Sequence, residues 1–404
     1  MAWLETQRPR DPLVIALILN SGSSSLKFHL ANLKSKIIIA HGIADWASNT
    51  CNYKLNSQSD TVQSTLSFSG AAPCFHHLVN DLQSRFQNEM NQLIIIGHRV
   101  VHGGSLVKAT LLNTNALDEI KSASTFAPLH NPPALELINE SIKLLPNIKQ
   151  IACFNTAFHS TMPKEAYTYP IPHAWTEEFK LRRFGFHGLN YAWCSAKAAL
   201  LLGPEKSKLV ICHLGHGASA CAVSKGKSIY TTMGLTPLEG LMMGTRSGTI
   251  DPGIIFHLAR TQKLSPEEIE KSLLKDSGLL GVSGKSADMR LVISAAQSGD
   301  ERAKLAIDIY CLRVQQAIGA LSTTLGGLDA VIFTAGVGEN AALIREKVIA
   351  QLGFLGLEID PALNDACQPD SDISSTNSKG RILVLTAREE LQMLHEIDSH
   401  FSLG

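Results

Sequence analysis

The stretch from Val14 to Leu30 reads VIALILNSGSSSLKFHL, and it constrains the fold more than any other part of the chain. Residues 15–19 are all apolar, which predicts a buried strand. Small polar residues at 20–25 then predict a turn, and the alternating residues 26–30 predict a second strand. The N–H groups and hydroxyls of such a turn can bind an anion, with Lys27 close by as a positive charge. The same stretch also suits an ordinary hairpin whose serines merely favour a turn.

A similar pattern occurs a second time at residues 208–224, which read KLVICHLGHGASACAVS. An apolar strand leads into a glycine-rich turn, which is followed by small and apolar residues. Two strand–turn–strand units roughly 190 residues apart indicate a duplicated domain. We expect the two copies to face each other across a cleft, so that both turns approach one phosphate chain.

The composition limits the classes of function that fit this chain. Its 404 residues are enough for two or three domains. Equal numbers of basic and acidic residues, 36 of each, argue against a nucleic-acid or membrane-surface partner. The eight cysteines form no C-x-x-C pair and are expected to be reduced core residues of a cytoplasmic protein. Residues 1–13 are polar and are predicted to be a flexible extension, and no apolar run is long enough to span a membrane.

Cations and histidines follow several of the predicted strands. A strand at 93–96 leads into GHRVVHGG, which places Arg99 beyond the carboxyl end of that strand, where sites commonly form. Residues 150–154 form the next strand, and Asn155 and His159 follow it directly. Both residues could instead be structural: Arg99 could pair with a surface carboxylate, and His159 could form a hydrogen bond in the core.

The densest irregular stretch is MGLTPLEGLMMGTRSGTIDPG at residues 233–253. Long irregular loops within compact domains are usually functional. Arg246 lies between Gly244 and Gly248, and its guanidinium can bind a phosphoryl group through two hydrogen bonds.

The remaining segments read as alternating helices and strands. They are a helix opened by the prolines of 128–133, a helix from a capping box at Ser265 to Gly278, a long helix at 300–321, a strand at 330–334, a helix opened by Gly336–Asn340, a polar surface loop at 360–380, a strand at 382–385 and a closing helix at 389–400. The Gly-x-Gly at 336–338 lacks a third glycine, so it predicts a mononucleotide contact and not a dinucleotide fold.

Taken together, these blocks resemble the acetate kinase family, which also includes propionate and butyrate kinases. The resemblance covers residues 14–396, and its motifs are NSGSSSLK, GHRVVHGG, APLHNPP, RRFGFHG, TPLEGLMMGTRSG and FTAGVGEN, in the order of the family. It implies an α/β fold of duplicated ribonuclease H-like domains, as in actin, hexokinase and Hsp70, with the active site in the cleft between them. The implied domains are residues 14–157 with 389–404, and residues 158–388. A homodimer is implied as well.

The implied reaction is ATP + acetate ⇌ ADP + acetyl phosphate, with Mg²⁺ or Mn²⁺. By position, the resemblance implies roles for four groups of residues. The catalytic positions are Arg99, Asn155, His187 and Arg246; the pocket for the methyl group is Val101, Leu129, Phe186 and Pro237; the metal positions are Asn20 and Glu389. The nucleotide positions are Ser23, Ser25, Lys27, His213, Gly215, His216, Gly217, Asp288, Met289, Arg290, Gly336, Val337, Gly338, Glu339 and Asn340.

The chain departs from the family's pattern at several of these places. Asn155 stands where the family has an aspartate regarded as catalytic, so the shape is kept and a negative charge is lost. His216 replaces an asparagine and Tyr230 an aspartate, while Leu189-Asn190-Tyr191 replaces Thr-Ser-His and Ala387-Arg388 replaces Thr-Asn. A carboxylate substrate is already ionised at pH 7, so the reaction needs no general base.

Three functions therefore stay open at this point. The first is an acetate kinase, and the second is a kinase for propionate or another short-chain acid. The third is a nucleotide-binding protein without turnover, which the asparagine at position 155 favours. A sugar kinase is excluded because two arginines and an apolar pocket suit a short carboxylate and not a polyol.

Overall fold

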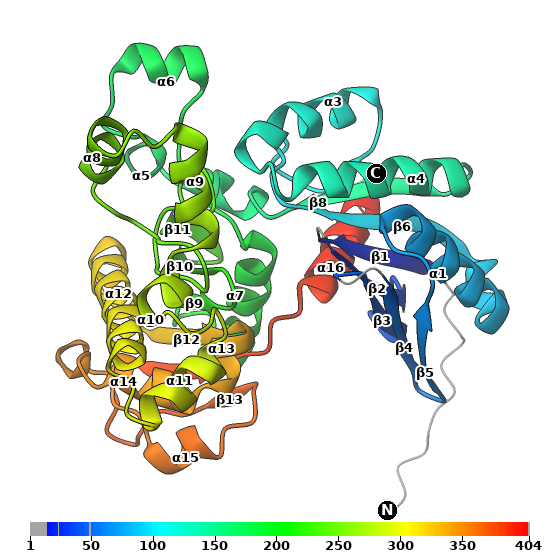
Figure 1. Ribbon diagram of the computed structural model, residues 1–404. Coiled ribbons are helices and arrows are strands. Elements are labelled where there is room, and N and C mark those ends of the chain that lie inside the picture. Colours follow the sequence, from blue (N-terminus) through cyan, green and yellow to red (C-terminus); the bar gives the residue numbers. More distant parts are fainter. Residues whose placement is uncertain (1–13, 23, 48–49, 403–404) are drawn as a thin grey trace, which may run out of the picture. The chain divides into compact units, whose positions relative to one another are not determined.

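The computed structural model describes residues 14–22, 24–47 and 50–402, so the extension predicted at 1–13 and Ser23 lie outside the described residues. The chain divides into two compact units, Met1–Ala157 with Glu389–Gly404 and Phe158–Arg388. Figure 1 follows the chain through both units in sequence colours. Each unit is built around one mixed β-sheet with helices on its faces.

The first unit contains eight strands and six helices within the described residues. The strands are β1 (Ile15–Ser21), β2 (Ser25–Asn32), β3 (Ile38–Asp45), β4 (Cys51–Ser57), β5 (Thr61–Leu66), β6 (Leu93–Val100), β7 (Thr110–Leu111) and β8 (Lys149–Phe154). The helices are α1 (Ala71–Arg85), α2 (Gln87–Met90), α3 (Thr114–Ser122), η1 (Ala123–Phe126), α4 (Asn131–Leu144) and α16 (Glu389–Ser402).

The sheet of the first unit runs in the order β5-β4-β3-β2-β1-β6-β8-β7. Strands β1 to β5 are antiparallel neighbours, whereas β6 is parallel to β1 and β8 is parallel to β6. The carboxyl ends of β1, β6 and β8 therefore meet at one edge of the sheet, which is the edge where sites form in such folds.

Helices cover both faces of this sheet. Leu17 and Leu19 point into a core shared with α1 and α4, and by alternation Ile18 points to the other face. That other face is covered by α16, because a Cβ added at Gly97 would lie 2.6 Å from Cδ1 of Ile397 and 2.9 Å from Cδ1 of Ile18. The glycine in β6 therefore lets the last helix of the chain pack closely on the first sheet.

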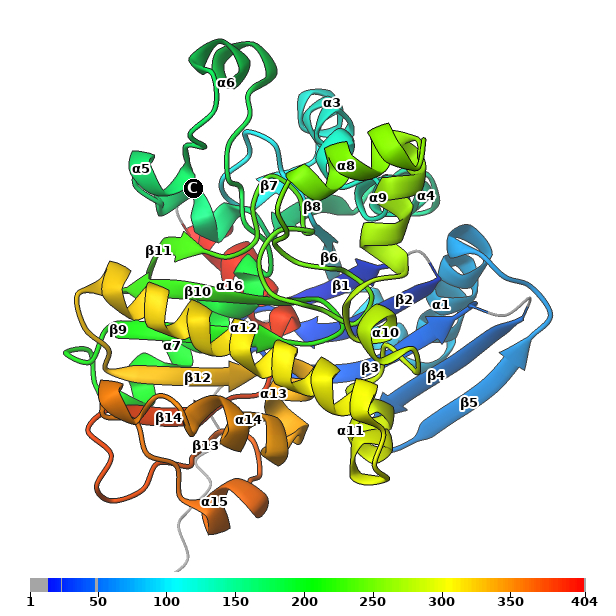
Figure 2. The same cartoon turned by 60° about the vertical axis from the view of Figure 1, so that its left-hand side comes forward.

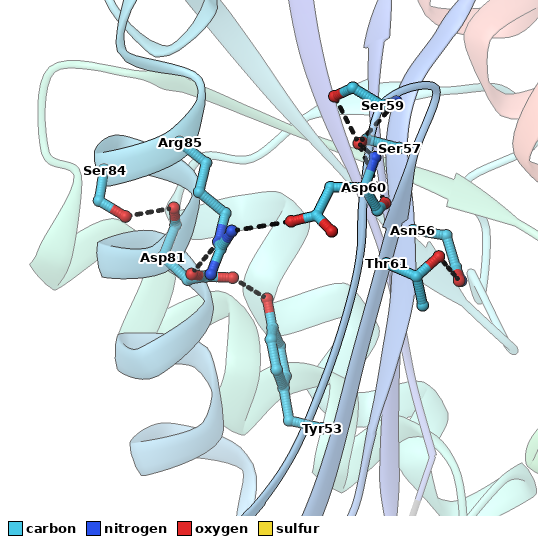
Figure 3. A network of polar contacts seen from close by, with 9 residues as sticks. All are labelled: Tyr53, Asn56, Ser57, Ser59, Asp60, Thr61, Asp81, Ser84 and Arg85. Carbon is cyan, nitrogen blue, oxygen red and sulfur yellow. Dashed lines mark hydrogen bonds and ion pairs between the residues drawn. The ribbon is translucent and has the colours of Figure 1, made fainter.

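A polar network fastens α1 to the hairpin of β4 and β5 (Figure 3). The hydroxyl of Tyr53 donates to Asp81 at 2.9 Å, and Nε of Arg85 donates to the same carboxylate at 2.6 Å. Arg85 also forms an ion pair with Asp60 at 3.3 Å. The hydrogen bond with Asp81 raises the pKa of Arg85, and burial raises the pKa of Tyr53, so both groups stay protonated.

The second unit contains six strands and a larger set of helices. The strands are β9 (Lys208–Leu214), β10 (Ala218–Ser224), β11 (Lys227–Thr231), β12 (Ala330–Thr334), β13 (Ser371–Asp372) and β14 (Arg381–Val384). The helices are η2 (Ala157–Thr161, at the boundary), α5 (Lys164–Tyr167), α6 (His173–Phe179), α7 (Gly188–Leu202), α8 (Gly253–Thr261), α9 (Pro266–Lys275), α10 (Gly278–Ser283), α11 (Met289–Gln297), α12 (Glu301–Leu325), α13 (Ala335–Asn340), α14 (Ala342–Ile349), η3 (Gly353–Leu355) and α15 (Pro361–Asp365).

The second sheet repeats the plan of the first. Its order is β11-β10-β9-β12-β14-β13, with β9, β10 and β11 antiparallel and with β12 and β14 parallel to β9. The strands β3-β2-β1-β6-β8 of the first sheet have the same order and directions. The duplicated α/β fold predicted from the two strand–turn–strand units is therefore confirmed.

The two faces of the second sheet are covered by α7 and α12. Tyr191 and Cys194 of α7 pack against Leu209 and Ile211 of β9. Figure 2 shows α12 crossing the other face, over β9, β10 and β12. The sheet is thus buried on both sides, as expected where helices connect parallel strands.

Two predicted boundaries and one predicted loop were wrong. Strand β6 continues to Val100, so Arg99 lies within it; the preceding His98 is a buried strand residue whose Nε2 is 2.8 Å from Oε1 of Gln150. Helix α9 ends at Lys275, and Gly278 begins α10 at φ 62°, where a Cβ would lie 2.2 Å from the carbonyl oxygen of Met243. The polar segment at 360–380 contains α15 and β13, since Asp360 caps the helix and Ile373 is buried.

Two further predictions concern the cysteines, expected to be reduced core residues, and the absence of a membrane-spanning segment. All eight cysteines are free, and every one except Cys367 is buried. Among the residues that the structure describes, no helix combines the length and the apolarity that a membrane span requires.

The capping box predicted at Ser265 is present and offers a direct test of local stability. The hydroxyl of Ser265 accepts from the N–H of Glu268 at 3.2 Å, and the Glu268 carboxylate accepts from the N–H of Ser265 at 2.8 Å. We expect Ser265→Ala to lower the free energy of unfolding by about 1 kcal/mol, measured by urea denaturation. Ser294→Ala, in the exposed interior of α11, is the control and should cause no loss. An unchanged midpoint for Ser265→Ala would contradict the prediction.

Candidate active site

Three predicted site residues of the first unit meet at the carboxyl edge of its sheet. Arg99 lies near the end of β6, Asn20 near the end of β1, and Glu389 is the first residue of α16. Nε of Arg99 forms an ion pair with Oε2 of Glu389 at 2.7 Å, and its Nη1 donates to Oδ1 of Asn20 at 3.4 Å. All three side chains are half-buried. A cation and two oxygen ligands are therefore held together by elements far apart in the sequence.

Asn155 reaches the same edge from the neighbouring strand. It directly follows β8, and its N–H donates to the carbonyl of Val100 at 3.0 Å. The side chain is 1% exposed, and its Oδ1 has no hydrogen-bond partner among the described residues. An unsatisfied buried amide oxygen costs roughly 1–3 kcal/mol, so this atom suits contact with a bound group.

The residues of this edge fit a hard divalent cation. Asn20, Asn155 and Glu389 offer two amide oxygens and one carboxylate, and within the described part of the chain the Asn155 oxygen has no hydrogen-bond partner. Mg²⁺ prefers oxygen ligands, binds few protein side chains and retains water or substrate phosphates. With only one carboxylate, which Arg99 partly neutralises, the protein supplies little charge to such an ion.

His187 is a predicted site residue of the second unit. It is the N-cap residue of α7, with left-handed backbone angles of φ 60° and ψ 20°. Its Nδ1 is 2.8 Å from Oγ of Ser219 in β10, and its ring stacks on His213 at 3.9 Å between centroids. Two strands and a helix therefore fix the imidazole.

Arg246 lies in the irregular loop that the sequence predicted, and hydrogen bonds fasten that loop on both sides. Its Nη1 donates to the carbonyl of Pro237 at 2.7 Å. The neighbouring Ser247 N–H donates to Leu273 in α9 at 3.1 Å, and the Gly244 N–H donates to His216 at 3.0 Å. Desolvation lowers the pKa of Arg246. The same burial strengthens the interaction of its guanidinium with an anion, because little water competes for the hydrogen bonds.

Gly217 lies between Arg246 and His187. A Cβ added to this glycine would be 2.9 Å from Nη2 of Arg246 and 3.6 Å from Nε2 of His187. The turn between β9 and β10 therefore brings a bare backbone segment next to both groups. An anion at this turn can be contacted by a guanidinium, an imidazole and backbone N–H groups at once.

This contact predicts the effect of a single methyl group. We expect Gly217→Ala to lower kcat several-fold, because the Cβ at 2.9 Å forces the Arg246 guanidinium away from the turn. Gly319→Ala in α12, where a Cβ meets nothing within 4 Å, is the control and should leave kcat unchanged. Steady-state kinetics and melting temperatures of both variants check this. Unchanged kcat in Gly217→Ala would show that the guanidinium tolerates the methyl group.

His213 and His216 border the same turn. Nδ1 of His213 is 2.9 Å from Nδ2 of Asn190, which also lies 3.3 Å from Oγ1 of Thr334. The His216 ring lies beside Gly244, where an added Cβ would be 2.9 Å from its Nδ1. Desolvation, followed by the positive charge of Arg246, lowers the pKa of His216.

Comparison with known proteins decides the family. Residues 15–395 match the Acetokinase family. The chain is 44% identical to the acetate kinase of Microcystis aeruginosa over 94% of this chain and 98% of that protein. It is 39% identical to the acetate kinase of Acetivibrio thermocellus, over 94% and 97%. This protein belongs to the acetokinase family.

Solved structures agree with that assignment. A propionate kinase from Francisella tularensis superposes with a TM-score of 0.89 at 40% identity, covering 95% of this chain and 98% of that one. The acetate kinase of Porphyromonas gingivalis gives a TM-score of 0.88 at 33% identity, covering 96% and 100%. The family therefore establishes a kinase that uses ATP, while the similar structures include both an acetate kinase and a propionate kinase.

The four residues predicted to form the acid pocket of this acetokinase lie in pairs in the two units. Val101 is half-buried just after β6, and Leu129 is 47% exposed before α4. Phe186 is buried and its carbonyl is 2.9 Å from Nε2 of His159, while Pro237 binds Arg246. Their contact with a substrate stays a prediction.

The predicted nucleotide residues differ in what their side chains do. Asp288 caps α11, and its carboxylate accepts from the exposed Arg290, whereas Met289 is buried. Oε1 of Glu339 accepts from the N–H groups of Ala335 and Ala387 at 2.8 and 2.9 Å.

The other predicted nucleotide residues lie in α13, in the turn after β9 and in β2. Gly336, Val337, Gly338 and Asn340 lie in α13, directly after β12, and Gly215 to Gly217 form the turn after β9. In the first unit, Ser25 begins β2, and its carbonyl accepts from the Gly22 N–H at 2.7 Å, while Lys27 is exposed.

Sequence reasoning missed three residues that hold the predicted site histidines, two of them directly and Tyr191 through Ser219. Asn190 and Tyr191 were noticed only as departures from the family, and Ser219 was not assigned a role. They contact His213, Ser219 and His187, respectively. For Asn190 and Tyr191 the available signal was their spacing from His187, because positions three and four after a helical residue share its face.

Another departure has a structural explanation in the same unit. The ring of Tyr230 lies under the guanidinium of Arg183, 4.9 Å from its carbon to the ring centroid. Arg183 also pairs with Glu239 at 2.6 Å and donates to three carbonyls of residues 231–233. Tyr230 thus packs on a buried arginine.

Proposed function

We propose that this protein transfers the γ-phosphoryl group of Mg-ATP to the carboxylate of acetate, forming acetyl phosphate and ADP reversibly. The observation that carries the proposal is the pairing of Arg246 with His187 across Gly217, which offers two hydrogen-bond donors to an anion. Membership of the acetokinase family supports the reaction class. Relatives named acetate kinase at 39–44% identity support acetate as the acid.

The reaction requires neutralisation of the negative charge on the phosphoryl group, and it does not require a general base. A carboxylate oxygen attacks the γ-phosphorus, and the bond to the bridging oxygen of ADP breaks. The nucleophile is ionised at pH 7, so the uncharged Asn155 does not deprive the reaction of a base. The transition state of phosphoryl transfer is loose, with negative charge on the transferred oxygens. Arg246 and His187 donate to those oxygens, and Arg99 orients the carboxylate.

Glu389, Asn20 and Asn155 are the residues that would hold the divalent cation of the nucleotide. When bound, that ion supplies positive charge to the phosphates. Arg99 keeps Glu389 in place at 2.7 Å. We propose that the residues of both units serve this one reaction.

The test is formation of acyl phosphate from ATP and each of acetate, propionate and butyrate, trapped as the hydroxamate. We expect the highest kcat/KM for acetate. One methylene in an apolar pocket is worth about 1–3 kcal/mol, so discrimination against propionate should be roughly 10- to 200-fold. A higher kcat/KM for propionate would favour the second candidate, which the propionate kinase among the similar structures supports.

The third candidate, a nucleotide-binding protein without turnover, rests on Asn155. Nucleotide binding by calorimetry together with no acyl phosphate from any of the three acids would establish it. Acyl phosphate formation above the no-enzyme rate would exclude it.

We also propose that the protein is a homodimer. Ile254, Ile255 and Phe256 of α8 are exposed together, and a patch of apolar side chains commonly marks a subunit interface. Light scattering after size-exclusion chromatography should give twice the chain mass of 43.7 kDa. The variant Phe256→Asp should shift that mass toward the monomer if α8 lies in the interface.

A further inference from the structure

The first turn of α7 carries two polar side chains that connect to two stacked histidines, one directly and the other through Ser219. Asn190 and Tyr191 follow the N-cap residue His187 by three and four positions, so they share its face of the helix. The Tyr191 hydroxyl bonds to Oγ of Ser219, which is 2.8 Å from Nδ1 of His187. Nδ2 of Asn190 is 2.9 Å from Nδ1 of His213.

Counting hydrogens decides the direction of the bonds around Ser219. Tyr191 and Ser219 are both 0% exposed, so the phenol must donate its proton within the protein. Burial raises the pKa of Tyr191 well above its usual range, so that proton is always present. If Tyr191 donates to Ser219, the single hydroxyl proton of Ser219 is directed to Nδ1 of His187. The reverse order would leave the phenol proton without an acceptor among the residues that the structure describes, at a cost of roughly 1–3 kcal/mol.

The same argument applies to His213. The amide of Asn190 lies with its Oδ1 toward the thiol of Cys194, from which it accepts at 3.6 Å, and with its nitrogen on the opposite side. That nitrogen faces both Oγ1 of Thr334 and Nδ1 of His213. An amide nitrogen is only a donor, so Nδ1 of His213 must accept.

We propose that Tyr191 and Asn190 are positioning residues that hold His187 and His213 as neutral imidazoles protonated at Nε2. Two imidazolium rings stacked at 3.9 Å would repel each other, so the neutral pair also suits the stacking. Each Nε2 borders the glycine turn: that of His187 is 3.6 Å from a Cβ at Gly217, and that of His213 is 3.5 Å from a Cβ at Gly215.

The consequence rests on the proposed function. A neutral imidazole with its proton on Nε2 donates a hydrogen bond to an anion at the turn, whereas the other tautomer presents a lone pair and repels it. Tyr191 would thereby determine whether His187 assists phosphoryl transfer, although it touches no substrate itself.

Nitrogen-15 NMR of the histidine rings tests the proposal without any catalytic readout. In the wild type without ligands at pH 7.5, we expect both His187 and His213 to show unprotonated Nδ1 and protonated Nε2; His187→Gln and His213→Gln assign the signals. Tyr191→Phe keeps the ring and frees Ser219 to accept, so the Nδ1-protonated form of His187 should become populated. Asn190→Asp replaces the donor by an acceptor and should move the proton of His213 to Nδ1.

The controls separate this effect from general damage. Tyr310→Phe removes another buried hydroxyl, one without a hydrogen-bond partner among the described residues, and should change neither ring. If Tyr191→Phe does not fold, Ser219→Ala removes the donor to His187 directly and should give the same shift. A wild-type His187 protonated at Nδ1, or an unchanged tautomer in both Tyr191→Phe and Ser219→Ala, would overturn the proposal.

Kinetics then connect the tautomer to the reaction. We expect Tyr191→Phe to lower kcat about 10-fold with KM for ATP unchanged, a split that loss of a packing contact would not give. If the wild type makes no acyl phosphate, the proposed function fails, and the NMR result still stands by itself. If the tautomer shifts and kcat does not, the proposed link between the two is wrong.

Discussion

Arg246→Ala is expected to lower kcat by about 10²- to 10³-fold, which is the cost of removing one preorganised donor to a developing charge. The guanidinium is held by Pro237 at 2.7 Å, and its desolvation lowers its pKa, so its interaction with the transferred phosphoryl group is poorly screened. ATP binds through other groups as well, and its dissociation constant from calorimetry should change by less than 10-fold. Arg246→Lys should lie between, because it keeps the charge and loses the two-pronged geometry.

The control for Arg246 is Arg313→Ala on the exposed side of α12, which should leave kcat unchanged. Melting temperatures of all three variants exclude a loss of folded protein. A parallel loss of nucleotide affinity and kcat in Arg246→Ala would contradict a role in the transition state and assign the residue to ground-state binding.

Asn155→Asp is expected to lower the Mg²⁺ concentration at half-maximal activity by about 10- to 100-fold, the range over which groups at a metal site change metal affinity. The Oδ1 atom is buried and has no hydrogen-bond partner among the described residues, and Glu389 is shared with Arg99. A second carboxylate would double the negative charge that the protein offers to the cation. The measurement is the initial rate over a Mg²⁺ titration at saturating ATP and acetate.

Urea unfolding tests the substitution Asn155→Asp independently of activity. A buried carboxylate without a partner is costly, so Asn155→Asp should unfold at a lower urea concentration in EDTA and recover with Mg-ADP. Asn155→Ala removes the oxygen without adding charge and should raise the Mg²⁺ requirement. An unchanged or higher Mg²⁺ requirement in Asn155→Asp would show that this oxygen does not face the cation.

Much of the fold could be read from local patterns. The strand–turn–strand units at 14–30 and 208–224 correspond to β1-β2 and β9-β10, and the strand predicted at 330–334 is β12. Strands β1, β9 and β12 are mostly apolar and buried because helices cover both faces of their sheets, and such runs stand out in the sequence, whereas β2 was visible from its alternation. The capping box at Ser265 was equally visible, since all of its partners lie within four residues.

What could not be read depends on contacts between distant residues. Arg99 was expected beyond its strand, because nothing local shows that β1 pairs with β6 as far as His98 and that β8 pairs with it as far as Val100. The ion pair with Glu389 joins residues 290 positions apart (389 − 99). The bonds from Asn190 to His213 and from Tyr191 to Ser219 likewise join α7 to β9 and β10. The motifs identified the residues, and only the fold shows which of them meet.

The return of α16 to the first sheet has a consequence for synthesis on the ribosome. Ile397 and Met393 cover Gly97 and Ile18, yet they are translated after the entire second unit. While residues 158–388 emerge and fold, the face of the first sheet that carries Ile18 lacks the cover of α16. Exposed apolar sheet is prone to aggregation, so the nascent protein should depend on chaperones until its last fourteen described residues, 389–402, have left the exit tunnel.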